Sequence, residues 1–277
     1  MDKRAKWMVL GVAGAGAVTL AFVVARKRYA PDLGPARIEG HVPLDETSGM
    51  VVGNDGILWM HNDSGADAIL YAVSPAGEVL GAVEVIGAGS RDWEDLARGR
   101  CGRGNCLYVA DIGDNARRRD RVTIYRLTEP DVRDGQVQAE RMDLVYPDGP
   151  VNAEALFVDD STLHLLTKES GTTRHMRAEF QPGEGVWEHI QTIDLPASRS
   201  ELVTGADFHS RLRRVLVRTY GHVYEYHLRR DGLLGESREL PVEEERQGET
   251  IAYSHRGDRY WHVSEGEGSP IWSHPRR

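Results

Sequence analysis

The chain has few cysteines and lacks the usual catalytic motifs. Only two of its 277 residues are cysteines, which excludes a disulfide-built scaffold and a cysteine-rich zinc module. The sequence contains no G-x-S-x-G, no H-E-x-x-H and no P-loop. The common sequence signatures of serine hydrolases, zinc proteases and nucleotide enzymes are therefore missing, and any activity must come from residues brought together by the fold.

Positive charge is scarce outside the N-terminus. The chain has 34 Lys+Arg and 43 Asp+Glu, for a net charge of -9. Because residues 1–30 hold six basic residues and one acidic residue, residues 31–277 carry -14. A general nucleic-acid binder needs clustered positive charge, so that function is excluded. With 40% hydrophobic residues and a mean hydropathy of -0.46, the bulk of the chain is expected to be soluble and globular.

One long hydrophobic run occurs near the N-terminus. Trp7–Ala25 contains a single polar residue, Thr19, and basic residues flank it on both sides. As a helix this run would be about 28 Å long, close to the thickness of a bilayer core, and one span excludes a multi-pass transporter. We expect residues 1–30 to be an uncleaved membrane anchor and residues 31–277 to be the second domain. A cleaved signal peptide with secretion is the alternative, although the run is longer than the about 7–15 residues of a usual signal core.

Short β-type segments fill residues 31–277. Runs of four to seven residues rich in Val, Ile, Leu and Tyr are separated by Gly, Asp, Asn and Pro, which indicates an all-β fold. Five repeats share one order: an acid that opens a strand, a polar cluster that ends the next strand and, in four of them, an aromatic in a third strand. The opening acids are Glu46, Glu94, Glu154, Asp207 and Glu249.

The repeat length predicts a β-propeller. Successive opening acids lie between 42 and 60 residues apart, which is the length of a four-stranded propeller blade. The fifth repeat ends at Arg277 before a fourth strand, and Ala36–His41 is an unpaired strand candidate that can complete it and close the ring. We therefore predict five four-stranded blades. Six blades and an irregular β-sandwich are the alternatives.

The recurrent polar features are expected to meet at one mouth of the propeller channel, because the innermost strand begins and the second strand ends on the same face. Besides the opening acids, this face would carry His61, Asp63, Asp92, Lys168 and Glu265. So many carboxylates repel one another unless they are protonated, paired or bound to a cation. Calcium accepts oxygen ligands in irregular geometry, which suits five unequal blades. Turn capping by the individual acids is the alternative.

Cys101 and Cys106 lie in the short connection between the first two strands of the second repeat. We expect a disulfide between them and hence a domain outside the cytoplasm. Free thiols are the alternative, since a zinc site needs two more ligands and a thioredoxin-like motif has two intervening residues. Four arginines in residues 117–121 indicate a solvated basic loop, with an anion site as the alternative.

Several segments resemble a group of bacterial exported β-propellers, and more loosely the phytase-like and gluconolactonase/regucalcin-like propellers. They are His61–Gly65 (HNDSG), Asp92–Ala97 (DWEDLA), Tyr108–Asn115 (YVADIGDN), Ile124–Pro130 (IYRLTEP), Asn152–Asp159 (NAEALFVD) and Arg246–Tyr253 (RQGETIAY). The resemblance covers most of residues 40–270 and implies a calcium or other divalent ion at the channel mouth, with hydrolysis of phosphoesters or lactones. By position it implies the metal ligands Glu46, Glu94, Asp111, Glu154, Asp207 and Glu249. The several lysines that a phytase uses around phosphate are missing, because Lys168 is the only lysine after Lys27.

Two functions follow as expectations. The first is a metal-dependent hydrolase at the membrane surface, in which the ion polarises a phosphoryl or acyl oxygen. Glu94 or Glu154 would be the general base, and His61 or Lys168 would contact a small anionic substrate. The second is a non-catalytic, calcium-stiffened propeller that binds an envelope protein or a glycan. In both cases we expect the domain to face the periplasm or the cell surface.

Overall fold

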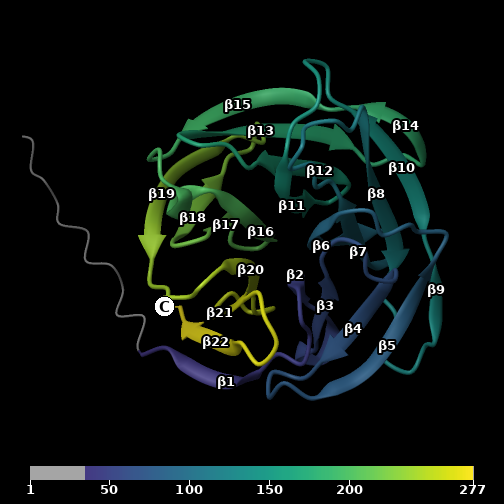
Figure 1. The fold of residues 1–277 in the computed structure, drawn as a ribbon, viewed down its shortest axis with the longest axis vertical. Coiled ribbons are helices and arrows are strands. Elements are labelled where there is room, and N and C mark those ends of the chain that lie inside the picture. The colour runs from purple at the N-terminus through teal and green to yellow at the C-terminus, as the bar shows by residue number, and fades with distance from the viewer. Residues whose placement is uncertain (1–34, 277) are drawn as a thin grey trace, which may run out of the picture. The chain divides into compact units, whose positions relative to one another are not determined.

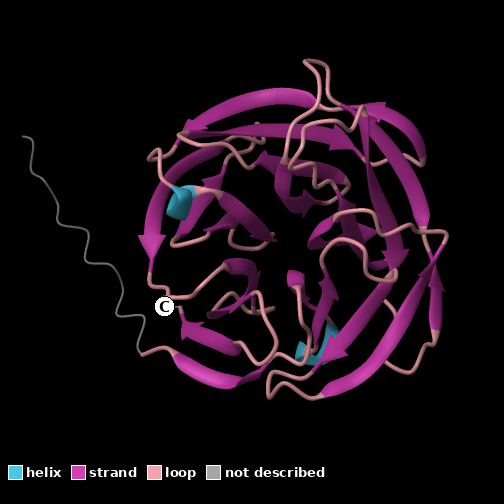
Figure 2. Cartoon of the chain, in the orientation of Figure 1, coloured by secondary structure: helices cyan, strands magenta, loops and turns pink. Residues whose placement is uncertain are grey.

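Five β-sheets stand around a common axis in residues 35–276, which are the residues that the computed structural model describes (Figure 1). Strands make up nearly all of the regular structure, and the helical content is two short turns, η1 (Asn54–Gly56) and η2 (Arg199–Glu201) (Figure 2). The predicted all-β propeller with five blades is therefore confirmed, and six blades and a β-sandwich are excluded.

Each blade has four strands, named here from the axis outwards, and the blades are numbered 1 to 5 in chain order. The innermost strands are β2 (Thr47–Val52), β6 (Trp93–Cys101), β11 (Ala153–Asp159), β16 (Val203–His209) and β20 (Gly248–Tyr253). The second strands are β3 (Leu58–Asn62), β7 (Gly104–Asp111), β12 (Thr162–Thr167), β17 (Arg214–Thr219) and β21 (Arg259–Ser264). The third strands are β4 (Ile69–Val73), β8 (Arg121–Thr128), β13 (Thr172–Glu179), β18 (Val223–Leu228) and β22 (Pro270–Pro275). The outermost strands are β5 (Val79–Ile86), β10 (Glu140–Val145), β15 (Glu188–Asp194), β19 (Leu234–Leu240) and β1 (Arg37–His41).

The hydrophobic core lies between the blades. Five separate clusters of buried apolar side chains occur in the described residues, one at each junction of neighbouring blades. Because an inner strand contacts a blade on each side, β16 is buried at every position, whereas the outermost β15 alternates between exposed and half-buried residues. Short strands rich in Val, Leu and Ile fit this arrangement, since both of their faces are covered near the axis.

The N-terminal strand closes the ring. β1 pairs antiparallel with β22 and supplies the outermost strand of blade 5, whose other three strands come from the C-terminus. The predicted pairing of Ala36–His41 with the last repeat is thus confirmed. Val42 and Leu44, just after β1, are buried in the cluster between blades 5 and 1, so the closing segment contributes apolar burial as well as backbone hydrogen bonds.

Two blades carry a fifth strand that the sequence did not predict. β9 (Gln136–Gln138) leaves the β8–β10 connection of blade 2 and pairs in parallel with β5 of blade 1. β14 (Gly183–Val186) leaves the β13–β15 connection of blade 3 and pairs in parallel with β10 of blade 2. Each of these segments covers the open edge of the preceding blade.

The predicted disulfide is present. Cys101 at the end of β6 and Cys106 on β7 are bonded, with their Cα atoms 5.7 Å apart. The bond crosses the hairpin that joins the first two strands of blade 2. The predicted anchor in residues 7–25 lies outside the described residues. Among residues 35–276 no helix is long and apolar enough to cross a membrane.

Removing the closing strand should destabilise the domain and make it aggregate. A chain that starts at residue 42 lacks β1 and leaves the edge of β22 unpaired, whereas a chain that starts at residue 31 retains the whole strand. Losing a few kcal/mol would lower the melting temperature by on the order of 10 °C in the shorter chain. Differential scanning calorimetry and sedimentation of both chains test this, and equal melting temperatures and solubility would contradict the role given to β1.

Candidate functional site

A one-residue register shift occurs at the second residue of every innermost strand. In blade 3, for example, Ala153 pairs with Thr167 but Ala155 pairs with Leu166, so Glu154 is the extra residue of a β-bulge. A bulge leaves its extra residue out of the ladder and turns the side chain away from the normal alternation. The equivalent residues in the five blades are Ser48, Glu94, Glu154, Thr204 and Glu249.

Three of these bulge residues, Glu94, Glu154 and Glu249, line one cavity of about 120 Å³ at the mouth where the innermost strands begin. The cavity wall is strongly acidic. Its carboxyl groups belong to Glu46, Asp63, Glu94, Glu154, Glu249 and Glu265, and its single cation is Lys168. Tyr220, Asn115 and Gln247 complete most of the polar wall. The predicted convergence of strand-opening acids at one mouth is therefore present for these three blades.

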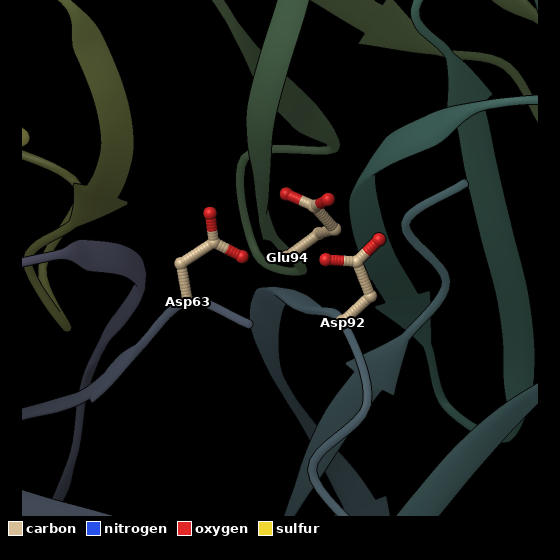
Figure 3. A group of neighbouring side chains, drawn as sticks. All are labelled: Asp63, Asp92 and Glu94. Atoms are coloured by element: carbon tan, nitrogen blue, oxygen red, sulfur yellow. The ribbon is translucent and has the colours of Figure 1, made fainter. Parts of the chain in front are cut away.

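Asp63, Asp92 and Glu94 form the tightest carboxylate group. One oxygen from each lies within 4.8 Å of the others, and Figure 3 shows the three carboxylates directed toward a common space. At that separation each pair of charges repels by about 3 kcal/mol for an effective dielectric constant of about 20. Burial raises the pKa of Asp92 to about 6, and burial followed by the charge of Glu154 raises the pKa of Glu94 well above its ordinary value. The group must hold protons or a cation near neutral pH.

Two neighbouring residues fit this group for an ion. A Cβ at Gly113 would overlap Glu94 Oε1 and the Asp92 carboxylate, so glycine lets the two acids approach. Thr47 Oγ1 is buried in the cavity wall without a hydrogen-bond partner among the described residues, which leaves an oxygen available as a ligand. All of these donors are oxygen atoms, as hard divalent cations prefer. The cluster could therefore hold a metal ion.

Glu154 is held by two donors on its own blade. Lys168 Nζ lies 2.5 Å from Oε2, and Asn152 Nδ2 donates to Oε1 at 3.0 Å. Lys168 also donates to the hydroxyl of Tyr220 at 2.7 Å. Burial alone would lower the pKa of Lys168, but the charge of Glu154 raises it above the ordinary value. Lys168 is therefore a permanent cation that neutralises Glu154 and orients Tyr220.

Glu249 is the carboxyl group in the cavity with the lightest hydrogen bonding. Gln247 Nε2 donates to its Oε1 at 2.9 Å and also contacts Glu265. Burial first, and the charge of Glu154 second, raise the pKa of Glu249 to about 8. Its Oε2 accepts no hydrogen bond from the described residues. A carboxyl group with a pKa near neutrality and one free oxygen can accept and return a proton.

Three of the six expected metal ligands lie away from the cluster of bulge glutamates. Glu46 is exposed at the rim of the cavity. Asp111 is buried in an ion pair with Arg119, at 2.8 Å. Asp207 lines the cavity at the other end of the channel, where its carboxylate accepts the backbone N–H groups of Phe208 and Tyr253. The first and fourth repeats were thus aligned out of register, since the positions equivalent to Glu94 are Ser48 and Thr204.

His61 and the basic loop also depart from expectation. His61 has no exposed surface, does not line the cavity and packs edge-on against Trp93, with ring centroids 5.4 Å apart. Burial lowers the pKa of His61 to about 4, so it is a neutral core histidine. Arg119 is buried rather than solvated and bonds Asp111 and the carbonyl of Gly113. Of the expected substrate-contacting residues, only Lys168 reaches the cavity.

Sequence reasoning missed several residues of the site. Tyr220 follows the second strand of blade 4, in the position that Asp63, Lys168 and Glu265 occupy in three other blades. Comparing the residue after each second strand would have found it. Ser48 and Thr204 escaped because they carry no charge, and their hydroxyls donate to the backbone carbonyls of Glu94 and Gly248 in the next blade.

Solved structures of low sequence identity share the fold. The PQQ-bound aldose sugar dehydrogenase of Streptomyces coelicolor aligns at 13% identity over 89% of this chain and 99% of its own, with a TM-score of 0.50. The gluconolactonase XC5397 of Xanthomonas campestris aligns at 13% identity over 88% and 90%, with a TM-score of 0.50. The glutaminyl cyclase of Myxococcus xanthus aligns at 12% identity over 86% and 95%, with a TM-score of 0.52. No family model and no curated protein sequence matches the chain. These likenesses show the propeller fold and are consistent with the expected gluconolactonase-like architecture.

The metal-free protein should lose stability as the pH rises, in part through Glu249. Its folded pKa of about 8 lies above the ordinary value of 4.5, so between these values the folded state holds a proton that the unfolded chain has released. Stability therefore falls with increasing pH in this window, by up to about 1.4 kcal/mol per pH unit for one group. Glu249→Gln should flatten this part of the profile. Urea unfolding in chelator from about pH 5 to about pH 8.5 tests the difference, with the exposed Glu78→Gln as control, and equal slopes in all three proteins would contradict it.

Proposed function

We propose that this protein is a calcium-dependent hydrolase of small, uncharged lactones that acts at the acidic cavity. The observation that carries the proposal is the convergence of Asp63, Asp92 and Glu94 within 4.8 Å beside a cavity that also holds Tyr220 and Glu249. A cation site, a hydrogen-bond donor and a carboxyl group with a raised pKa are thus next to one another. These are the parts required for metal-assisted addition of water to an ester.

The charge of the cavity favours an uncharged substrate over the anionic substrate that the sequence led us to expect. A phosphoester would enter beside six carboxyl groups, and the one cation, Lys168, is already paired with Glu154. One divalent ion would leave most of that negative charge uncompensated. A neutral lactone meets no such repulsion, and its ring hydroxyls can hydrogen-bond the polar wall. This argument selects the lactone branch of the expected hydrolase.

The residues divide the work of the reaction as follows. Asp63, Asp92 and Glu94 would hold the ion, which when bound supplies a Lewis acid for the carbonyl oxygen. Glu249 takes a proton from the attacking water through its free oxygen and returns it to the ring oxygen as the C–O bond breaks, giving a hydroxy acid. Tyr220, whose oxygen accepts from Lys168, keeps its own proton to donate to the substrate.

This division revises two expected roles. Glu94 was a candidate general base but belongs to the carboxylate cluster, so we assign it to the ion. Glu154 was the other candidate, yet both of its oxygens accept hydrogen bonds, from Asn152 and Lys168. A carboxylate that is paired in this way is a poor proton acceptor, and we assign Glu154 the positioning of Lys168.

Activity should require calcium and the two groups in the cavity. Hydrolysis of glucono-1,5-lactone by the chelator-treated protein should appear on addition of calcium, and p-nitrophenyl phosphate should remain intact. Asp92→Asn should lower the calcium-dependent rate about 10–100-fold or more, and Glu249→Gln should lower kcat about 10²–10⁴-fold. Glu78→Gln, an exposed acid outside the cavity, is the control. If calcium raises the melting temperature but no lactone is hydrolysed, the catalytic proposal fails and the cavity is a stabilising ion site of a binding propeller.

We further propose that the domain lies outside the cytoplasm on an anchor formed by residues 7–25. The Cys101–Cys106 disulfide supports this location, because such bonds persist in oxidising compartments. The apolar run Trp7–Ala25 supports the anchor. Protease added to intact spheroplasts should digest the domain, and thiol labelling of the unreduced protein should find no free cysteine. Protection from protease together with labelling of both cysteines would place the domain inside the cell.

A further inference from the structure

The opposite end of the channel has a second cavity, of about 280 Å³, with a different charge. It lies where the innermost strands end and the hairpins to the second strands turn back. Its charged wall contains three arginines, Arg98, Arg100 and Arg211, against two aspartates, Asp160 and Asp207. The volume is close to the lower end of the range of small-ligand sites. In a domain that carries -14 overall, a cavity with more arginines than acids requires an explanation.

Arg98 is fixed in position from behind. Its Nε donates to Glu129 at 2.8 Å and its Nη2 donates to Asn54 at 2.9 Å. The Glu129 side chain is only 2% exposed, so this pair lies in the wall and not in the opening. The remaining nitrogen, Nη1, forms no other bond among the described residues. An arginine that is already ordered loses little conformational entropy when it binds an anion.

Arg100 and Arg211 bring positive charge that the protein leaves uncompensated. Arg100 follows Arg98 by two residues on β6 and therefore lies on the same face of the strand, and it is exposed. Arg211 comes from the β16–β17 hairpin of blade 4 and donates Nη2 to the neutral carbonyl of Arg256 at 2.8 Å. Neither Arg100 nor Arg211 forms an ion pair in residues 35–276. The two lie on different blades and line one cavity.

The acids of this cavity compensate little of that charge. The two oxygens of Asp207 accept the backbone N–H groups of Phe208 and Tyr253, at 2.8 and 2.7 Å, and the side chain is buried. Asp160 is exposed at the tip of the β11–β12 hairpin. Arginine side chains on neighbouring hairpins, Arg103 and Arg256, add to the positive field around the opening.

The β6–β7 hairpin that carries two of the arginines is also rigid. Arg100 pairs with Asn105 in the ladder, and the Cys101–Cys106 disulfide crosses the same hairpin one residue beyond Arg100. Asn105 lines the cavity as well. The chain thus presents planar guanidinium donors from a covalently braced loop, and such donors match the oxygens of a phosphate group in pairs.

From this geometry we propose that the second cavity binds a small phosphate-bearing anion through Arg98, Arg100 and Arg211. A phosphate carries close to two charges at neutral pH, so it suits three converging guanidinium groups better than a monocarboxylate does. The binding is independent of the acidic cavity and of the hydrolase proposed above. The phosphate can belong to a soluble ester or to a lipid headgroup, and both share the chemistry that the arginines recognise.

Titration of the full-length protein with inorganic phosphate and pyrophosphate by isothermal calorimetry tests the proposal. Chelator is present throughout, so that the acidic cavity and its ion take no part, and chloride at equal ionic strength is the reference. Binding is expected for the unmodified protein. The double variant Arg100→Gln/Arg211→Gln should weaken it at least tenfold. Arg133→Gln is the matched control, because Arg133 is an exposed arginine on the β8–β9 connection, away from the cavity, and it should leave the affinity unchanged.

Vesicles of phosphatidylcholine with and without phosphatidic acid distinguish the two sources of phosphate. Cosedimentation with the acidic vesicles that pyrophosphate reverses, and that the double variant abolishes, identifies a lipid headgroup, whereas binding of the soluble ions alone identifies a soluble ester. The proposal is overturned if neither the ions nor the vesicles bind. It is also overturned if binding survives in the double variant or falls equally in Arg133→Gln. Equal melting temperatures of the three proteins confirm that each is folded.

Discussion

The β-bulge at the second residue of each innermost strand is the constraint on which the rest of the site depends. In a regular strand the residues that precede and follow the bulge would alternate between the two blade interfaces, and both interfaces are apolar. The extra residue frees one side chain per blade from that requirement. Three blades use this position for Glu94, Glu154 and Glu249. The acidic cavity is therefore a consequence of ladder geometry repeated around an axis.

The two ends of the channel differ because different parts of the repeat form them. One end collects bulge residues and the residues that follow the second strands, and these are mostly acids. The other end collects hairpin turns, and in blades 2, 4 and 5 these turns carry arginines. Buried aspartates separate the two ends: Asp95 accepts backbone N–H groups from blades 2, 3 and 4, with N–O distances of 2.8 to 3.0 Å. A carboxylate bonded in this way fixes the blades to one another, and it contributes to neither cavity.

Much of the architecture could be predicted from the sequence because it depends on local patterns. Strand alternation and repeat length gave the five blades, and an unpaired strand candidate at the N-terminus gave the closure. Cys101 and Cys106 gave the disulfide. Glu94, Glu154 and Glu249 were found since each precedes a hydrophobic run. Asp207 was misplaced because an acid near a strand start satisfies the same pattern three residues too late.

The rest required knowledge of partners that are distant in the chain. Asp111 and Arg119 were both visible as charged residues, but nothing local shows that they neutralise one another. His61 sits in a polar string, yet its burial depends on Trp93 of the next blade. Tyr220 is aromatic in a position where an acid or lysine stands in other blades. Side-chain pairing across blades is a tertiary property, and a repeat pattern constrains only the backbone that carries it.

The two parallel strands β9 and β14 make the ring mechanically uneven. Blade 2 is tied to blade 1 by β9, and blade 3 is tied to blade 2 by β14, so blades 1 to 3 form an arc that is held together by backbone hydrogen bonds as well as by side chains. Blades 4 and 5 have no such strand among the described residues. Local opening requires the fewest broken backbone bonds at the junctions of blade 4. Tyr220 belongs to blade 4 and Glu249 to blade 5, so the proton-handling side of the cavity lies on the arc that opens most readily, while Asp63, Asp92 and Glu94 lie on the arc that stays shut.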